Sequence, residues 1–274
     1  MRMLSNLLIS VAIAYAAVLA LVYLFQSRLV FYPEVGREVT VSPQTYGLKF
    51  EAIDLPTVDG ETLNAWWVPA DEARGAILFL HGNAGNISHR LDYLLMFNRM
   101  HYSTLIVDYR GYGRSTGSPS EEGTYRDADA AWEYLLGARS LRPRNIVIAG
   151  ESLGGAVASR LAARVEPRAV VLLSTFTSAT DLGAQIYWFL PVRLISRLGY
   201  DNAENLKRIR VPVFVAHSRD DDIIPYSHGK KLFDVANEPK AFLEMRGGHN
   251  DGFLFTRPEW SAQLAAFLDK HAAN

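Results

Sequence analysis

The stretch Asn145-Ile-Val-Ile-Ala-Gly-Glu-Ser-Leu-Gly-Gly-Ala-Val-Ala-Ser-Arg-Leu-Ala162 decides the fold of this chain. Its first half is an apolar run that predicts a buried strand, and the small apolar residues after Ser152 predict a helix. Between them, Gly150-Glu-Ser-Leu-Gly154 matches G-x-S-x-G, the pattern of a strained turn that exposes a serine hydroxyl above a sheet. The sequence therefore predicts Ser152 as a nucleophile on a strand-to-helix turn.

A second stretch, Gly113-Arg-Ser-Thr-Gly117, fits the same pattern. It follows a glycine-rich loop and precedes Ser118-Pro119, so neither a strand nor a helix adjoins it. We therefore expect Ser115 to be a loop residue.

Short apolar runs alternate with helical stretches from Gly75 onward, which is typical of a parallel α/β sheet. Two earlier runs, 49–55 and 61–68, flank the turn Val58-Asp-Gly60 and predict an antiparallel pair at a sheet edge. Trp66 and Trp67 should then face opposite sides of the sheet. The other predicted strands cover 76–80, 103–107, 146–149, 169–173, 211–216 and 241–245; helices are expected at 88–100, 124–136, 226–235 and 259–271 and after the serine turn.

Residues 181–210 do not fit this alternation and are long enough to form a cap insertion over an active site. Their apolar part includes Tyr187, Trp188 and Phe189, which could contact an acyl chain or could simply belong to the core. We expect residues 1–29 to be a membrane anchor and residues 30–274 to be one catalytic domain, because 274 residues with 49% apolar content can bury one substantial core.

Residues 7–25 form a run of 19 residues without a charge, which as a helix would span about 28 Å against a hydrocarbon core of about 30 Å. A cleaved signal peptide is the competing interpretation, but its apolar region is usually shorter and ends at small residues. Here bulky residues continue up to Gln26, which favours an uncleaved anchor in a lipid bilayer. Arg2 precedes the run while Arg28 and Arg37 follow it, so the charges leave its orientation open.

Composition limits the possible partners and chemistry. The formal charge of −1, from 28 Lys and Arg against 29 Asp and Glu, provides no basic field for nucleic acid. With no cysteine in the chain, a disulfide, a thiolate metal site and a cysteine nucleophile are excluded. Covalent catalysis would have to use Ser, Thr, Lys or a carboxylate.

A serine nucleophile needs a base and an acid that orients the base. His249 lies in the loop Arg246-Gly-Gly-His-Asn-Asp251 directly after the last predicted strand, at the sheet edge where catalytic groups gather. The acid should lie in His217-Ser-Arg-Asp-Asp-Asp-Ile-Ile-Pro225, where the pattern leaves the choice among three consecutive aspartates open. We expect His217 and His228, which flank this loop, to be structural.

An oxyanion needs two backbone N–H donors. One should be Leu153, directly after the nucleophile, and the other should come from His81-Gly-Asn-Ala-Gly-Asn86, the loop after strand 76–80. Asn83 is the best candidate and Ala84 is the next, and Ala84 is also a candidate substrate-binding residue. A simple glycine turn is the alternative for this loop.

These motifs, together with Asp108-Tyr-Arg-Gly-Tyr-Gly-Arg-Ser115, resemble the α/β-hydrolase superfamily from about Val30 to the C-terminus. They are most similar to its membrane-anchored serine hydrolases, whose relatives include lysophospholipases, monoacylglycerol lipases and protein depalmitoylating thioesterases. The resemblance places the acid on the fourth residue after His217, which is Asp221, although Ser218 stands where the family usually has glycine. It also implies structural roles for Asp108 and Arg110.

The resemblance implies an esterase or thioesterase that acts on a small-molecule or lipid acyl substrate and requires neither a metal nor an organic cofactor. Ser152 would attack the acyl carbonyl, His249 would transfer the proton, and Asp221 would orient the imidazole. An aminopeptidase-like amide hydrolase could use the same three residues. A non-catalytic membrane scaffold that keeps the fold is the alternative from another functional class.

Overall fold

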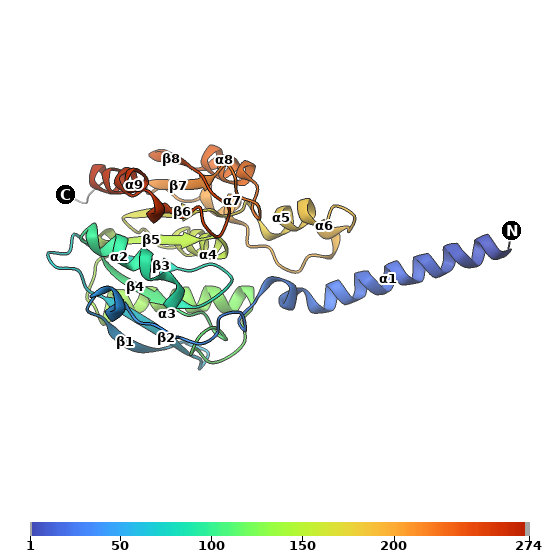
Figure 1. Ribbon diagram of the computed structural model, residues 1–274, viewed down its shortest axis with the longest axis horizontal. Helices are drawn as coiled ribbons and strands as arrows, with labels where there is room; N and C mark the ends of the chain where they lie inside the picture. Colours follow the sequence, from blue (N-terminus) through green and yellow to red (C-terminus); the bar gives the residue numbers. More distant parts are fainter. Residues whose placement is uncertain (1, 272–274) are drawn as a thin grey trace.

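One eight-stranded sheet organises the computed structural model, which describes residues 2–271 (Figure 1). The strand order is β1-β2-β4-β3-β5-β6-β7-β8, and the strands from β4 to β8 run parallel while β2 is antiparallel to both of its neighbours. The strands are β1 Glu51–Pro56, β2 Thr62–Val68, β3 Ala76–Leu80, β4 Ser103–Val107, β5 Ile146–Glu151, β6 Ala169–Leu173, β7 Val213–Ser218 and β8 Lys240–Met245. The predicted α/β fold and its antiparallel edge pair are confirmed.

Helices cover both faces of the sheet, and each face has its own apolar core (Figure 1). The helices are α1 Arg2–Val30, α2 Leu91–Arg99, α3 Glu121–Gly137, α4 Leu153–Ala162, α5 Ala179–Ile186, α6 Val192–Ile195, α7 Asn202–Leu206, α8 Tyr226–Val235 and α9 Pro258–Lys270. Helices α3, α4, α7 and α8 contribute to one core, and α2 and α9 contribute to the other. Trp67 belongs to the first core and Trp66 to the second, so these two residues face opposite sides as predicted.

Several predicted element ends shift for local reasons. The helix expected at 88–100 begins with a 3₁₀ turn, Ile87–Arg90, because the Asn86 side chain accepts the Ser88 N–H, and α2 starts only at Leu91. Strand β7 continues to Ser218, two residues beyond its predicted end, because His217 and Ser218 still pair with β8. This extension carries the β7 strand up to the predicted acid loop.

Helix α1 extends away from the rest of the molecule and contains the predicted span 7–25 (Figure 1). None of its residues is buried, and it is long and apolar enough to cross a membrane. Immediately after it, Phe31 is only 4% exposed and packs edge-on against Tyr200, with ring centroids 6.4 Å apart. The chain therefore joins the folded core directly at the end of α1.

The predicted cap insertion 181–210 is only partly separate from the sheet layers. Helices α5 and α6 stand beside α1, away from the sheet (Figure 1). Helix α7 belongs to a main layer, because its Leu206 is fully buried in the core shared with α4 and α8. We use the name α5–α6 segment for residues 179–198.

Candidate active site

Ser152 lies on the turn between β5 and α4, in a backbone conformation that non-glycine residues rarely adopt. Its φ is 53° and its ψ is −119°. Two hydrogen bonds hold this strained residue: its N–H donates to Leu173 O at 2.8 Å, and Thr175 Oγ1 donates to its carbonyl oxygen at 2.6 Å. The surroundings thus fix a conformation that would otherwise be unfavourable.

The glycines that flank Ser152 are required by close backbone contacts. A Cβ atom at Gly150 would collide with the carbonyl oxygen of Gly154, and a Cβ atom at Gly154 would collide with Leu80 O at the end of β3. Only glycine allows the first turn of α4 to pack this closely. Ser115, in the competing match, is instead a buried loop residue that donates to Asp108 O and accepts the Asn64 N–H.

His249 connects Ser152 to Asp221. Its Nε2 lies 3.1 Å from Ser152 Oγ, and its Nδ1 lies 2.8 Å from Asp221 Oδ2. The loops after β8 and β7 supply the histidine and the aspartate, and the turn after β5 supplies the serine. The structure thus brings together the three predicted residues. In the sequence, His249 is 28 positions from Asp221 and 97 positions from Ser152.

The Asp221 side chain is fully buried, and both of its carboxylate oxygens have partners. Oδ1 accepts the backbone N–H groups of Ile223 and Ile224 at 3.0 and 2.7 Å, while Oδ2 faces His249 and lies 3.4 Å from His217 Nε2. Burial by itself raises the pKa of Asp221, but hydrogen bonding from His217, His249 and the Ile224 N–H outweighs it and holds the pKa well below its usual range. The carboxylate is therefore ionised at neutral pH and can stabilise an imidazolium.

The two neighbouring aspartates support the His249 loop instead. Asp222 Oδ1 accepts the backbone N–H of His249 at 2.8 Å, and Asp220 forms an ion pair with Arg246 at 3.3 Å. Ser218, the departure from the family's glycine, donates its hydroxyl to Gly247 O at 2.5 Å. The acid loop and the histidine loop are therefore tied together at several points besides the Asp221–His249 contact.

The loop after β3 lies directly against the serine turn. A methyl group added to Gly82 would lie 3.3 Å from Ser152 Cβ, and Tyr112 Oη donates to Asn83 Oδ1 at 2.7 Å. Asn83 is half-buried and Ala84 is exposed. Leu153 is the first residue of α4, so its N–H has no acceptor within the helix.

An ion pair that the sequence analysis missed joins this loop to the turn. Arg90 Nε lies 2.8 Å from Glu151 Oε2, and both side chains are largely buried. Arg90 also donates to Ala84 O at 3.3 Å. Glu151 occupies a variable position of the G-x-S-x-G pattern and Arg90 lies 61 residues earlier, so no local signal links the two.

The histidines and polar residues that we expected to be structural form buried contacts. His217 Nε2 lies 2.8 Å from Ile224 O, and His228 Nδ1 accepts the Thr177 N–H. Asp108 accepts hydrogen bonds from Asn64 and from the Ile87 N–H, while Arg110 pairs with Asp59 and Asp127. These contacts join loops to the sheet.

The three aromatic candidates for substrate binding lie beside α1, whereas Ala84 lies in the loop after β3. Tyr187 lines a small apolar groove between α1 and the α5–α6 segment. Trp188 and Phe189 are 81% and 56% exposed, so they are not core residues. The core alternative for these two side chains is therefore wrong.

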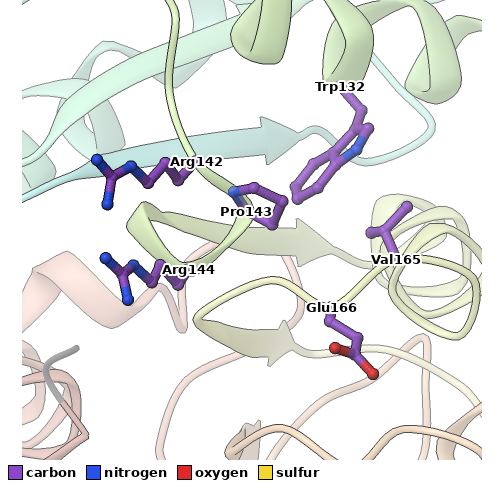
Figure 2. A pocket seen from close by; sticks show the side chains of 6 residues that line it. All are labelled: Trp132, Arg142, Pro143, Arg144, Val165 and Glu166. Atoms are coloured by element: carbon purple, nitrogen blue, oxygen red, sulfur yellow. The ribbon is translucent and has the colours of Figure 1, made fainter. Parts of the chain in front are cut away.

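A hollow in the surface also lies at the edge of the sheet opposite Ser152 and His249. Its lining side chains, shown in Figure 2, are Trp132, Arg142, Pro143, Arg144, Val165 and Glu166. Arg144 shortly precedes β5 and Glu166 shortly precedes β6, so the hollow sits at the amino ends of the strands. Ligands of open α/β sheets bind at the opposite edge, where Ser152 and His249 lie.

Comparisons with known proteins agree with this architecture. A family profile described as alpha/beta hydrolase fold matches residues 75–205. An uncharacterised protein of Mycobacterium tuberculosis is 36% identical over 96% of this chain and 94% of its own length. The alpha/beta hydrolase domain-containing protein WAV2 of Arabidopsis thaliana is 32% identical over 92% and 90%. A solved esterase structure from Pyrococcus furiosus, 18% identical, superposes with a TM-score of 0.70 over 85% of this chain and 95% of that one.

Proposed function

Because this chain belongs to the α/β-hydrolase family, we propose that it is a membrane-anchored serine hydrolase that cleaves carboxylic ester or thioester bonds of acyl substrates. The observation that carries this proposal is the continuous contact from Ser152 Oγ through His249 to Asp221, with distances of 3.1 and 2.8 Å. A serine, a base and an acid in this geometry are the requirements for nucleophilic acyl transfer.

The first half-reaction forms an acyl-enzyme. Ser152 Oγ attacks the acyl carbonyl carbon while His249 Nε2 takes its proton, and Asp221 stabilises the resulting imidazolium. The Leu153 and Asn83 N–H groups donate hydrogen bonds to the oxyanion, and the positive end of the α4 dipole stabilises it further. When the tetrahedral intermediate collapses, the bond to the alcohol or thiol breaks and His249 returns the proton to that leaving group.

The second half-reaction hydrolyses the acyl-enzyme. His249 removes a proton from water, the oxygen attacks the acyl carbon, and the proton passes to Ser152 Oγ as the acid leaves. Every proton transfer in both halves uses His249 Nε2. The chain's own residues therefore account for the whole cycle.

A fluorophosphonate probe tests the proposed nucleophile. We expect stoichiometric labelling of the folded protein and loss of labelling in Ser152→Ala. Failure of the folded wild-type protein to react would instead favour a non-catalytic scaffold with a hydrolase fold.

A substrate panel then addresses the bond that is cleaved. It should include p-nitrophenyl esters of increasing chain length, acyl-thioesters and aminoacyl amides. We expect turnover of esters or thioesters, whereas a preference for the amides would favour the aminopeptidase-like alternative.

Helix α1 is the proposed anchor, because none of its residues is buried and it is long and apolar enough to cross a membrane. Carbonate extraction of membranes should leave the full-length protein in the pellet. Recovery in the supernatant would contradict the anchor.

A further inference from the structure

The α5–α6 segment carries an apolar tip that the fold leaves in solvent. Trp188 and Leu194 are 81% and 86% exposed, and Phe189 is 56% exposed. The Trp188 and Phe189 rings contact each other, with centroids 5.9 Å apart, and Leu194 follows in α6. A cluster of large apolar side chains with this exposure marks an interaction surface.

The segment is attached to α1 by hydrogen bonds at two levels of the helix. Gln26 donates its amide to Ile195 O at 2.7 Å and accepts the Arg197 N–H at 2.7 Å. Further toward the N-terminus, Tyr15 Oη donates to Phe189 O at 3.1 Å. These contacts are 11 residues apart along α1, which corresponds to about 16 Å of helix.

This distance places the tip beside the proposed membrane-spanning part of α1. Gln26 directly follows the uncharged run 7–25, and Tyr15 lies in the middle of that run. A helix that crosses a hydrocarbon core of about 30 Å would therefore hold Tyr15, and the Phe189 carbonyl bound to it, near the mid-plane of the bilayer. The hydroxyl of Tyr15 gives this carbonyl the hydrogen-bond donor that a polar backbone group needs in lipid.

Arg197 of the segment lies at the Gln26 end of the span, where the proposed anchor would meet the membrane surface. Arg197 packs over the ring of Tyr23 at 5.4 Å, near the Gln26 end of the span, and Arg193 forms an ion pair with Asp181 at 2.8 Å. Arginine and tyrosine are favoured at the boundary between hydrocarbon and headgroups. The apolar tip of the segment thus matches the hydrocarbon layer of a leaflet, and the part of the segment that carries Arg197 matches the headgroup layer.

We propose that the α5–α6 segment is a second membrane contact, with its tip, residues 187–190 and Leu194, embedded in the leaflet that the C-terminal half of α1 crosses. This proposal rests on the proposed anchor in α1 and goes beyond it, because an anchor alone would leave the catalytic domain free to move above the membrane. With the segment embedded, the domain is held at a fixed height and orientation.

Single-cysteine labelling of the full-length chain tests the contact, and the absence of native cysteine means that no background substitution is needed. Trp188→Cys and Leu194→Cys each carry an environment-sensitive nitrobenzoxadiazole label in phosphatidylcholine vesicles. Val11→Cys in α1 reports a bilayer position, and Ala266→Cys, exposed on α9, reports an aqueous one. Quenching by doxyl-labelled phosphatidylcholine is compared with quenching by aqueous iodide.

We expect the labels at 188 and 194 to be quenched by the doxyl lipid as strongly as the label at 11 and several-fold more than the label at 266. Quenching like that at 266, with the label at 11 in lipid, would overturn the proposal and leave the anchor intact. Protection from iodide without lipid quenching would also overturn it, because a protein partner or a second copy would then cover the tip. An aqueous label at 11 would overturn both the anchor and the proposal.

Hydrolysis of a short soluble ester by the protein labelled at 266 reports on the proposed function separately, because Ala266 lies on α9, outside the proposed catalytic and substrate-binding residues. Loss of activity in that protein, with the labels at 188 and 194 quenched as expected, would contradict the hydrolase, not the membrane contact.

Discussion

Three consecutive aspartates take three different roles because the backbone of their loop points each side chain in a different direction. Asp221 faces the His249 imidazole, Asp222 accepts the His249 backbone N–H, and Asp220 pairs with Arg246. Only the first contact touches the imidazole that would carry positive charge during the proposed acyl transfer. The residues are chemically identical, so their effects on the reaction should differ according to these contacts.

We predict that Asp221→Asn lowers kcat by up to about 10⁴, because an amide favours the wrong imidazole tautomer and cannot stabilise the imidazolium. Asp222→Asn should cost far less, since an amide oxygen can still accept the His249 N–H, and Asp220→Asn should also cost little. Steady-state hydrolysis of a soluble ester by the three variants provides the comparison. A large loss in Asp220→Asn or Asp222→Asn, with Asp221→Asn near wild type, would contradict the assignment.

The two serines that match G-x-S-x-G provide a matched pair. We predict that Ser152→Ala removes ester hydrolysis by several orders of magnitude and leaves the fold intact, because the hydroxyl serves only chemistry. Ser115→Ala should retain activity but lower the melting temperature, since Ser115 Oγ joins Asp108 O to the Asn64 N–H inside the protein. The reverse pattern of activities would refute Ser152 as the nucleophile.

Asp108 makes stability depend on pH. Burial raises the pKa of Asp108 to about 6, although Asn64 and the Ile87 N–H donate to its carboxylate. The pKa of an aspartate in an unfolded chain is near 3.9, so between about pH 4 and 6 the folded state binds more protons than the unfolded state. The free energy of unfolding therefore falls as pH rises through this range, by about 3 kcal/mol in total.

We predict that Asp108→Asn makes this part of the stability profile less steep, because it removes one of two buried aspartates whose pKa is raised to about 6; Asp127 is the other. Denaturant unfolding at pH 4 and pH 6.5 measures the difference for each protein. Equal pH dependence in wild type and variant would show that Asp108 does not titrate in this window.

At the scale of elements, the sequence predicted the sheet well because each strand can be recognised from its own local sequence. Apolar runs of five or six residues separated by helical patterns identify strands without any tertiary information, and the loops after them identify the edge where the site forms. What the sequence did not reveal are contacts between distant elements. The Arg90–Glu151 pair joins the start of α2 to the end of β5, and nothing near either residue indicates its partner.

We predict that Arg90 positions the loop that carries Asn83. Arg90→Met should leave Glu151 buried without its partner and destabilise the protein by about 3–5 kcal/mol. It should also lower kcat, because the loop loses its connection to the serine turn. Arg99→Met, an exposed change at the other end of α2, should alter neither property.

The double variant Arg90→Met/Glu151→Gln separates stability from positioning. Removing both charges should restore much of the melting temperature, while kcat on a soluble ester stays about tenfold low with KM unchanged. Full recovery of kcat would mean that the pair contributes only to stability.

At the scale of the whole molecule, the N-terminal helix and the catalytic domain are more closely connected than the sequence indicated. Residues 7–25 predict a span and residues 30–274 a separate domain, but hydropathy carries no information on which part of the domain the helix meets. The structure shows these connections: Tyr15 and Gln26 form hydrogen bonds with the α5–α6 segment, and Phe31, directly after α1, enters the core. The boundary between anchor and domain therefore has to be drawn from these contacts.

This boundary leads to a prediction about truncation. Deleting residues 1–25 removes the proposed span but keeps Gln26 and Phe31, so we expect a soluble domain that hydrolyses short esters at the wild-type rate, because every proposed catalytic residue lies after residue 80. Deleting residues 1–31 also removes the Phe31 ring, which is 4% exposed and packs against Tyr200. Loss of a buried phenylalanine side chain costs about 3 kcal/mol or more, so the shorter protein should melt several degrees lower.

Thermal unfolding of the two truncated proteins, with ester hydrolysis measured beside it, tests this difference. Equal melting temperatures would place the domain boundary after Phe31, and an inactive but folded protein lacking residues 1–25 would show that α1 contributes to catalysis as well as to location.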